Sequence, residues 1–276
     1  MLQRNEIANE FENCSKLKKI VIPSSINSIG PFAFKCCSFL EQIIIPSSLT
    51  SIGKGAFRNC SSLKKIFIPS TVTSIDDYTF NYCSKLKKIW MPDSLTSIGK
   101  FSFEGCSSLV EIKIPSFVAF IGEFAFRQCT SLKQISIPSS VNVIEKGAFY
   151  GCKNLQQVSN FSTITLFADY LFSSCNLLKK ITISDSVTSI GNFSFEKCFN
   201  IKEIIIPQSV TLIGDNAFNE CTSLSQISIP SSVTSIGKCA FKNCQSLKEI
   251  SIPSSVKTIG NYSFYQCIHH WYKYQF

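Results

Sequence analysis

Apolar and polar positions along this chain repeat with a period of 23 residues, as residues 60–82 show: CSSLKKIFIPSTVTSIDDYTFNY. With Cys60 counted as position 1, the apolar residues Leu63, Ile66 and Ile68 stand at positions 4, 7 and 9. Alternation of β-branched residues with polar ones predicts a short strand with one buried face. Pro69 at position 10 cannot donate to a strand ladder, so we expect the strand to end there.

The second half of each unit predicts an extended return segment followed by a turn. Val at position 13 and Ile at position 16 supply two more buried side chains, and Gly at position 17 predicts a turn with positive φ. The next residues, x-x-A-F, predict one helical or 3₁₀ turn that packs Phe at position 21 inside. Phe holds position 21 in all twelve occurrences, from Phe11 to Phe264. A small residue before it lets neighbouring coils approach.

One such unit is too small to bury its own apolar residues. Stacked units bury one another, so we expect a solenoid of stacked repeats. We therefore expect a single domain over residues 1–276, with a partial repeat at 1–13, eleven repeats over 14–266 and a stub at 267–276. The predicted fold is a right-handed, curved stack of about eleven coils. It has a parallel β-sheet on the concave face and short turns, strands or 3₁₀ segments on the convex side.

Cysteine marks the start of every unit and predicts an inner column of thiols. Cys is small, apolar and tolerant of burial. A spacing of 23 is not that of a zinc site, and in-register side chains that point the same way give poor disulfide geometry. We expect buried free thiols, with Cys36 and Cys239 lying outside the column. The column consists of Cys14, Cys37, Cys60, Cys83, Cys106, Cys129, Cys152, Cys175, Cys198, Cys221, Cys244 and Cys267.

The repeated pattern L-x-x-I-x-I-P-x-x-V-x-x-I-G-x-x-A-F-x-x-C, as in residues 109–129, resembles the 23-residue leucine-rich repeats of the BspA-like family, which includes treponemal repeat proteins. The resemblance covers essentially the whole chain. It implies a right-handed leucine-rich-repeat solenoid used for binding, often as a surface antigen or adhesin toward host proteins or other cells. It brings no catalytic residues with it.

Composition adds a moderate positive charge and little chemistry. The 27 basic and 18 acidic residues give a net charge of +9, which favours acidic partners in general. The N-terminal MLQRNEIANEFENC has no apolar core, so no signal peptide is expected and the cytoplasm is one expected location. The resemblance favours the cell surface instead. No membrane span is expected, because no stretch approaches ~18 uncharged apolar residues.

The sequence offers no constellation of catalytic residues. The two histidines, His269 and His270, are adjacent in the tail, and the carboxylates are scattered. There is no phosphate-binding loop and no nucleophile elbow. We therefore expect a protein that is not an enzyme and that uses no cofactor or metal.

Differences between the repeats predict a binding surface near the N-terminus. At the outward position 8, the first four units carry apolar residues that grow in size: Val21, Ile44, Phe67 and Trp90. Adjacent strands place such residues side by side, and an exposed apolar row commonly marks an interaction site.

Lysines at positions 5 and 6 predict a basic stripe beside this row. Lys64, Lys65, Lys87 and Lys88 stand closest to Phe67 and Trp90. An alternative is that these lysines only keep the strands soluble. The whole stripe consists of Lys18, Lys19, Lys64, Lys65, Lys87, Lys88, Lys133, Lys179, Lys180, Lys202 and Lys248.

The seventh unit departs from the pattern, with Asn160 in place of Ile and Phe161 in place of Pro. An Asn that points inward needs hydrogen-bond partners, so we expect a local change of curvature over residues 158–172.

Three functions remain open at this point. The first is a protein-binding module with acidic or host-surface partners. The second is a cytosolic scaffold or regulatory subunit. The third is binding of an anionic glycan or nucleic acid through the lysines, of which nucleic acid is the weaker because no nucleic-acid fold signature is present. Copies that stack end to end are a further expectation.

Overall fold

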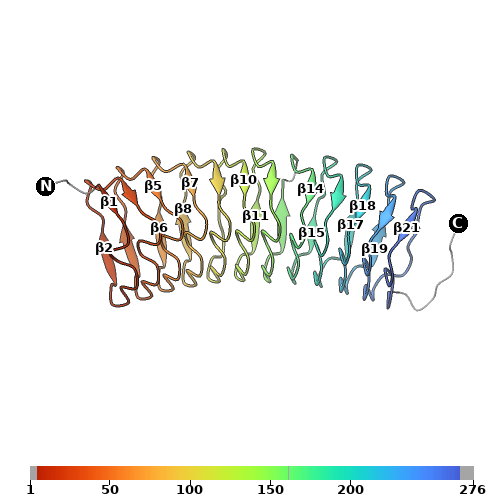
Figure 1. Ribbon diagram of the computed structural model, residues 1–276. Helices are drawn as coiled ribbons and strands as arrows, with labels where there is room; N and C mark the ends of the chain where they lie inside the picture. The colour runs from red at the N-terminus through yellow and green to blue at the C-terminus, as the bar shows by residue number, and fades with distance from the viewer. Residues whose placement is uncertain (1–4, 161, 268–276) are drawn as a thin grey trace.

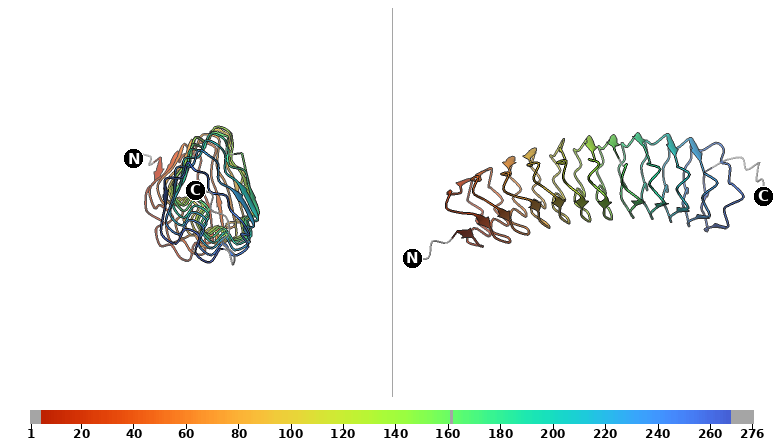
Figure 2. Two further views of the ribbon diagram at one scale, coloured as in Figure 1. Left: turned by 90° about the vertical axis from the view of Figure 1, so that its right-hand side faces the viewer. Right: turned by 90° about the horizontal axis from the view of Figure 1, so that it is seen from above.

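The computed structural model describes residues 5–160 and 162–267 as a curved stack of coils, one coil for each 23-residue unit (Figure 1). Viewed along the stack, the coils lie one behind another with similar outlines, and the view from above shows the first and last described coils at opposite ends of the stack (Figure 2). The solenoid fold of about eleven turns with parallel sheets is confirmed. No helix able to cross a membrane occurs among these residues.

Each full coil has room for two short strands, which form two ladders along the stack. The first ladder arises from the predicted I-x-I segment at positions 6 to 8. Its strands are β2 (Lys19–Val21), β4 (Gln42–Ile44), β6 (Lys65–Phe67), β8 (Lys88–Trp90), β11 (Gln134–Ser136), β13 (Gln157–Ser159), β15 (Lys180–Ile181), β17 (Glu203–Ile205) and β19 (Gln226–Ser228).

The second ladder comes from the return segment at positions 15 and 16. Its strands are β1 (Glu6–Ile7), β3 (Ser28–Ile29), β5 (Ser51–Ile52), β7 (Ser74–Ile75), β9 (Ser97–Ile98), β10 (Phe120–Ile121), β12 (Val143–Ile144), β14 (Leu166–Phe167), β16 (Ser189–Ile190), β18 (Leu212–Ile213), β20 (Ser235–Ile236) and β21 (Thr258–Ile259).

All strand pairs are parallel and join residues 23 apart, as in Val21↔Ile44 and Phe67↔Trp90. The register therefore brings the same position of neighbouring units together. The first ladder is interrupted at the coil that starts at Cys106, where only an isolated bridge joins Glu111 to Gln134, and again between β15 and β17. The second ladder is interrupted between β5 and β7 and between β12 and β14.

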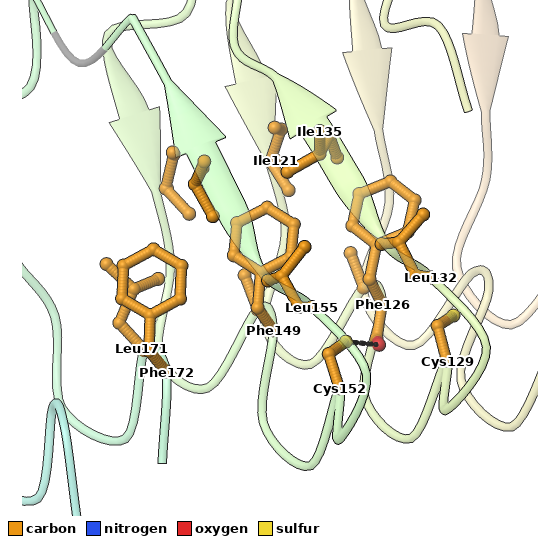
Figure 3. Packing of buried hydrophobic residues seen from close by; sticks show 14 of the residues in the cluster. Ile121, Phe126, Cys129, Leu132, Ile135, Phe149, Cys152, Leu155, Leu171 and Phe172 are labelled. Atoms are coloured by element: carbon orange, nitrogen blue, oxygen red, sulfur yellow. Dashed lines mark hydrogen bonds between the residues drawn. The ribbon is translucent and has the colours of Figure 1, made fainter. Parts of the chain in front are cut away.

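The core is a set of columns, each built from one position of the repeat. The inner phenylalanine column (position 21, Phe11 to Phe264) is stacked throughout, with ring centroids 5.1–5.6 Å apart between neighbouring coils. Figure 3 shows Phe126, Phe149 and Phe172 in line beside the leucines Leu132 and Leu155. Stacked rings at this separation add to the free energy gained by burial.

The cysteine column has a specific hydrogen-bonding role that its small size and apolarity did not reveal. The thiol of Cys152 donates to the carbonyl oxygen of Phe126 in the previous coil, with an Sγ···O distance of 3.1 Å (Figure 3). The same bond joins each cysteine from Cys37 to Cys244 to the phenylalanine 26 residues earlier, at 3.0–3.2 Å. Phe126 O also accepts from the N–H of Cys129 at 3.1 Å, so the thiol supplies a second donor to a buried carbonyl, which neither Ala nor Val could do.

The glycines at position 17 serve a different purpose from the predicted one. Gly53 does not have positive φ; instead, a Cβ there would lie 2.7 Å from the nitrogen of Pro31 and 2.8 Å from the carbonyl carbon of Gly30. Glycine is needed at this position because the backbones of neighbouring coils approach closely. The expectation of a positive-φ turn at position 17 is wrong.

Positive φ occurs instead at positions 19 and 23, mostly in residues other than glycine. Phe32 (φ 58°) and Cys36 (φ 60°) are examples. The x-x-A-F segment is accordingly a series of turns rather than a helix. The N–H of Phe32 donates to Lys54 O at 2.9 Å, and that of Cys36 to Arg58 O at 2.8 Å, so this conformation directs N–H groups toward the next coil.

The irregular seventh unit keeps its first strand, since β13 pairs with both β11 and β15. Asn160 does not point inward as expected. It is exposed with φ 67°, and its amide donates to Ser136 Oγ at 3.1 Å. Phe161 lies outside the described residues, and the change of curvature stays a prediction.

Candidate functional site

The predicted apolar row lies on the outer face of the first ladder, on strands β2, β4, β6 and β8. Position 7 of each strand faces the core, so position 8 must face outward. Ile66 is 2 % exposed, whereas the next residue, Phe67, is 61 % exposed. The other members of this sheet row are also exposed: Val21, Ile44 and Trp90, at 58 %, 44 % and 41 %.

The sheet row is continuous because its strands are paired in register. Val21 lies opposite Ile44, and Phe67 lies opposite Trp90. The link between the two pairs is β4 with β6, where Gln42 lies opposite Lys65. Four apolar side chains from sequence positions as far apart as 21 and 90 thus form one surface, which the sequence could indicate only through the constant period.

Lysine side chains flank this row and are exposed, as predicted from positions 5 and 6. Lys65 lies opposite Lys88, which brings two like charges onto adjacent strands. The Lys88 Nζ stands 4.9 Å from the centroid of the Trp90 ring, a cation–π contact. The face of the Trp90 ring is therefore in contact with a lysine of its own strand.

One lysine beside the row is neutralised by an acidic neighbour. Lys64 Nζ lies 2.6 Å from Glu41 Oε2 of the previous coil, and this ion pair holds the pKa of the Glu41 carboxyl below its usual range. Lys65, Lys87 and Lys88 have no ion-pair partner among the residues that the structure describes. The N-terminal half of the sheet face is therefore positively charged around an apolar centre.

A cavity next to Phe67 was not indicated by the sequence. It has a volume of about 290 Å³ and is lined by Ile45, Ser47, Phe67, Ile68, Pro69, Ser70, Met91 and Pro92. Its lining comes from three consecutive coils at the point where proline ends each strand. A sequence feature that could have indicated this cavity is Met91, which replaces the Ile of position 9 beside the prolines of position 10.

The remaining predicted residues lie at the margin of this site or away from it. Lys18 and Lys19 flank Val21 at one end of the sheet row, two coils from Phe67, and the stripe lysines from Lys133 to Lys248 lie further along the stack. The column cysteines from Cys37 to Cys267 are buried and take no part in the outer face. No cluster of His, Cys, Asp and Glu that could hold a metal is found over 5–160 and 162–267. His269 and His270 lie outside the described residues.

Comparison with known proteins decides the family. The sequence model described as "BspA type Leucine rich repeat region (6 copies)" matches residues 6–131, 73–198 and 149–270. The chain belongs to the BspA-type leucine-rich-repeat family. No curated protein matches the sequence.

Solved structures of this repeat type are similar along most of the chain. A leucine-rich repeat protein from Bacteroides ovatus is 32 % identical, with a TM-score of 0.68, over 94 % of this chain and 79 % of that one. The Treponema pallidum leucine-rich repeat protein is 32 % identical, with a TM-score of 0.56, over 60 % of this chain and 79 % of that one.

The pneumococcal vaccine antigen PcpA shares the fold at lower identity. It is 22 % identical with a TM-score of 0.56, over 87 % of this chain and 73 % of that one. These three structures are leucine-rich repeat proteins or antigens by their descriptions, and none is described as an enzyme.

Proposed function

We propose that this BspA-type solenoid is a non-catalytic binding module, of the surface-antigen or adhesin type, that captures a protein through the sheet row and the adjacent cavity. The observation that carries the proposal is the in-register exposure of Phe67 and Trp90 beside unpaired lysines. Large aromatic side chains at the centre of an interface contribute most of the binding free energy.

The chemistry of the surface indicates the chemistry of the partner. The apolar centre takes apolar side chains, with Phe67 forming both the row and one wall of the cavity. The flanking Lys65, Lys87 and Lys88 favour acidic groups at the rim of the interface, where charges mainly accelerate association. We therefore expect a protein whose contact surface is apolar with an acidic border.

A capture experiment with matched variants tests the site. The full chain is immobilised and exposed to a mixture of host cell-surface proteins, alongside the double variant Phe67→Ser/Trp90→Ser. The control is Ile205→Ser, because Ile205 holds the same position 8 on β17 and is 71 % exposed. We expect the double variant to lose the captured protein and the control to keep it.

Other outcomes point to other functions. Equal capture by the double variant rejects the sheet row as the site. Binding that survives the aromatic substitutions but falls steeply with salt assigns the surface to a polyanion on the lysine stripe, which a heparin column would then reproduce.

A further inference from the structure

A second aromatic column runs along the turns, two residues before the inner phenylalanines. This outer aromatic column (position 19) carries Phe32, Tyr78, Phe101, Phe124, Tyr170, Phe193 and Tyr262, each with positive φ. Where neighbours are both aromatic they pack closely: Tyr78 and Phe101 stack at 4.9 Å, and Tyr170 and Phe193 at 4.6 Å. Glycine interrupts the column at Gly55 and Gly147.

The interruption at Gly147 opens a cavity of about 190 Å³, which is lined by Phe124, Arg127, Lys146, Tyr150 and Tyr170. A Cβ at residue 147 would lie 2.1 Å from Phe124 Cε1, so Phe124 takes up the space of the missing side chain. The aromatic rings around this Gly147 cavity are not stacked. Phe124 and Tyr150 meet edge to face at 84°, and Tyr150 and Tyr170 are tilted by 58°.

Two cations line the Gly147 cavity and no carboxylate does. The Arg127 guanidinium lies 5.3 Å from the Phe124 ring and 5.4 Å from the Tyr150 ring, and Lys146 Nζ lies 5.3 Å from the Tyr170 ring. Glu104 holds one end of Arg127 at 3.2 Å, while the buried Arg127 Nε has no hydrogen-bond partner within the described chain.

Glu104 neutralises Arg127, whereas two other carboxylates near the cavity are engaged elsewhere and leave Lys146 without an ion-pair partner in the described chain. Glu145 Oε2 accepts from the N–H of Glu123 at 2.9 Å and lies 3.5 Å from Lys100 Nζ. Asp169 Oδ1 accepts from the N–H of Asn192 at 2.7 Å. The Gly147 cavity is therefore an aromatic box in which Arg127 is paired with Glu104 and Lys146 is the cation without an ion-pair partner among the described residues.

A related but incomplete arrangement occurs four coils earlier, at residues shifted by 92, where Arg58 stands in place of Tyr150. Lys35 is held by Glu12 at 2.9 Å and lies 5.4 Å from the Phe32 ring. Lys54, next to Gly55, lies 5.6 Å from the Tyr78 ring. The repetition of a Glu, a Phe, a cation, a Lys-Gly pair and a Tyr at one offset is unlike the random drift of surface positions.

Four coils later the arrangement is lost. The positions that correspond to Phe124, Arg127 and Gly147 are Asn216, Asn219 and Cys239, although Lys238 still stands where Lys146 does. This third place therefore provides a natural control that keeps the lysine and, at Tyr262, one aromatic residue, but lacks the counterparts of Phe124, Tyr150, Arg127 and Gly147.

We propose that the Gly147 cavity binds the carboxylate-bearing ring of an acidic sugar. The function differs from that proposed for the sheet row and uses another part of the coil. Lys146 would pair with the carboxylate, while the electron-rich faces of Phe124, Tyr150 and Tyr170 that the cations leave uncovered attract the electropositive C–H groups of a sugar ring. The volume is below the ~300–1,000 Å³ of drug-sized pockets, which suits a single ring.

A continuous polyanion fits less well because the charge alternates along this column. Position 18 carries Lys54, Asp77, Lys100, Glu123, Lys146 and Asp169 in successive coils. Neighbouring coils are about 4.8 Å apart, so the phosphates of a nucleic acid laid along the turns would meet carboxylates as often as lysines. An isolated anionic ring avoids this repulsion.

Saturation-transfer NMR on the full chain tests the proposal with sodium glucuronate as the probe and with glucose, acetate and a short oligothymidylate as comparisons. We expect transfer to glucuronate alone. Lys146→Gln should weaken its affinity at least about tenfold, which corresponds to about 1.4 kcal/mol. Phe124→Asn should abolish binding while leaving the fold intact, because Asn216 occupies the equivalent position with φ 54°.

Lys238→Gln is the matched control, since it removes the same charge from the third, incomplete place and should leave glucuronate binding unchanged. Equal binding of acetate, or of glucose, overturns the assignment to an acidic sugar. Binding of the oligothymidylate but not of glucuronate would reject the acidic-sugar assignment and identify the cavity as a nucleic-acid-binding site. No binding of glucuronate by the wild-type chain would leave the box a structural cation–π cluster and reject the proposal.

Discussion

The two aromatic columns differ sharply although they stand two residues apart in every coil. The inner phenylalanine column never varies, and its rings repeat at 5.1–5.6 Å from one end of the described stack to the other. The outer aromatic column contains Phe, Tyr, Gly, Asn and Cys. The inner ring touches copies of itself on both sides, so one substitution leaves two neighbours with the wrong partner. The outer ring has solvent on one side and is free to vary.

This contrast shows where function is to be sought in such a stack. The sheet row, the lysine stripe and the Gly147 cavity all come from positions that vary between coils. The buried columns, which do not vary, account for the stability of the fold. The following predictions test that division, beginning with the largest expected effect.

Alkaline pH should destabilise the interior far more than its apolar character suggests. Burial raises the pKa of the Cys152 thiol from its ordinary value near 9 to about 12, and burial raises the pKa of Cys83, Cys106 and Cys175 as well. The folded chain thus holds these protons more tightly than the unfolded chain does. Its stability is intact below about pH 9 and falls as the pH rises toward about 12, by up to about 1.4 kcal/mol per pH unit for each thiol.

Urea unfolding measured from about pH 8 to about pH 10.5 checks this slope. Lysines and tyrosines also titrate at high pH, so the informative quantity is the difference between the wild type and Cys152→Ala. The free energy of unfolding of Cys152→Ala should fall less steeply with rising pH, by the contribution of one thiol. Identical slopes for the two chains would mean that Cys152 ionises equally in both states.

Truncation of the inner column is the next largest effect. Phe149 is fully buried between Phe126 and Phe172 at 5.5 Å from each, so Phe149→Ala should cost about 3–5 kcal/mol. Phe39→Ala is the control, because Phe39 is 57 % exposed and its loss should change the free energy of unfolding by no more than about 0.5 kcal/mol. Chemical denaturation followed by circular dichroism measures both. Equal losses would contradict the assignment of the core.

Much of the fold could be predicted because the period is constant. A fixed spacing of 23 sets the register, the register stacks equal positions, and alternation within I-x-I separates Ile66 from Phe67. Those steps need only local sequence. The exposure of Val21, Ile44, Phe67 and Trp90 follows from them directly, whereas a role for these residues in binding is still a prediction.

What the sequence did not predict depends on contacts between backbones of neighbouring coils. The hydrogen bond from the Cys152 thiol to Phe126 O joins residues 26 positions apart, and no local sequence pattern predicts it. The positive φ of Phe32 is invisible in its residue type, because bulky residues rarely adopt it. The two cavities likewise arise from three adjacent coils, at Met91 and Gly147, and appear only when the coils are stacked.

The position-17 glycines should be less replaceable than glycines with positive φ. Gly53→Ala places a Cβ 2.7 Å from backbone of the previous coil, which should cost about 1–3 kcal/mol because the coils must separate. Gly151 has φ 69° but space for a Cβ, whose nearest neighbour is 3.5 Å away, and Asn59 occupies the equivalent position with φ 60°. Gly151→Asn should therefore stay within about 0.5 kcal/mol of the wild type.

Unfolding midpoints in urea compare the two glycine variants. The reverse order, with Gly151→Asn the more destabilised, would show that backbone conformation rather than the approach of the coils limits these turns.

Stacking in the outer aromatic column should be the smallest effect that can be measured. Tyr78 and Phe101 are half-buried and their rings are stacked and nearly parallel, at 4.9 Å and 8°. A double-mutant cycle of Tyr78→Ala and Phe101→Ala should give a coupling of about 0.5–1.5 kcal/mol, well below the loss for Phe149→Ala. Tyr170 and Phe193, the equivalent pair 92 residues later at 4.6 Å and 6°, should give the same coupling. A coupling at one pair and none at the other would show that the two pairs, although alike in sequence and geometry, are not energetically equivalent.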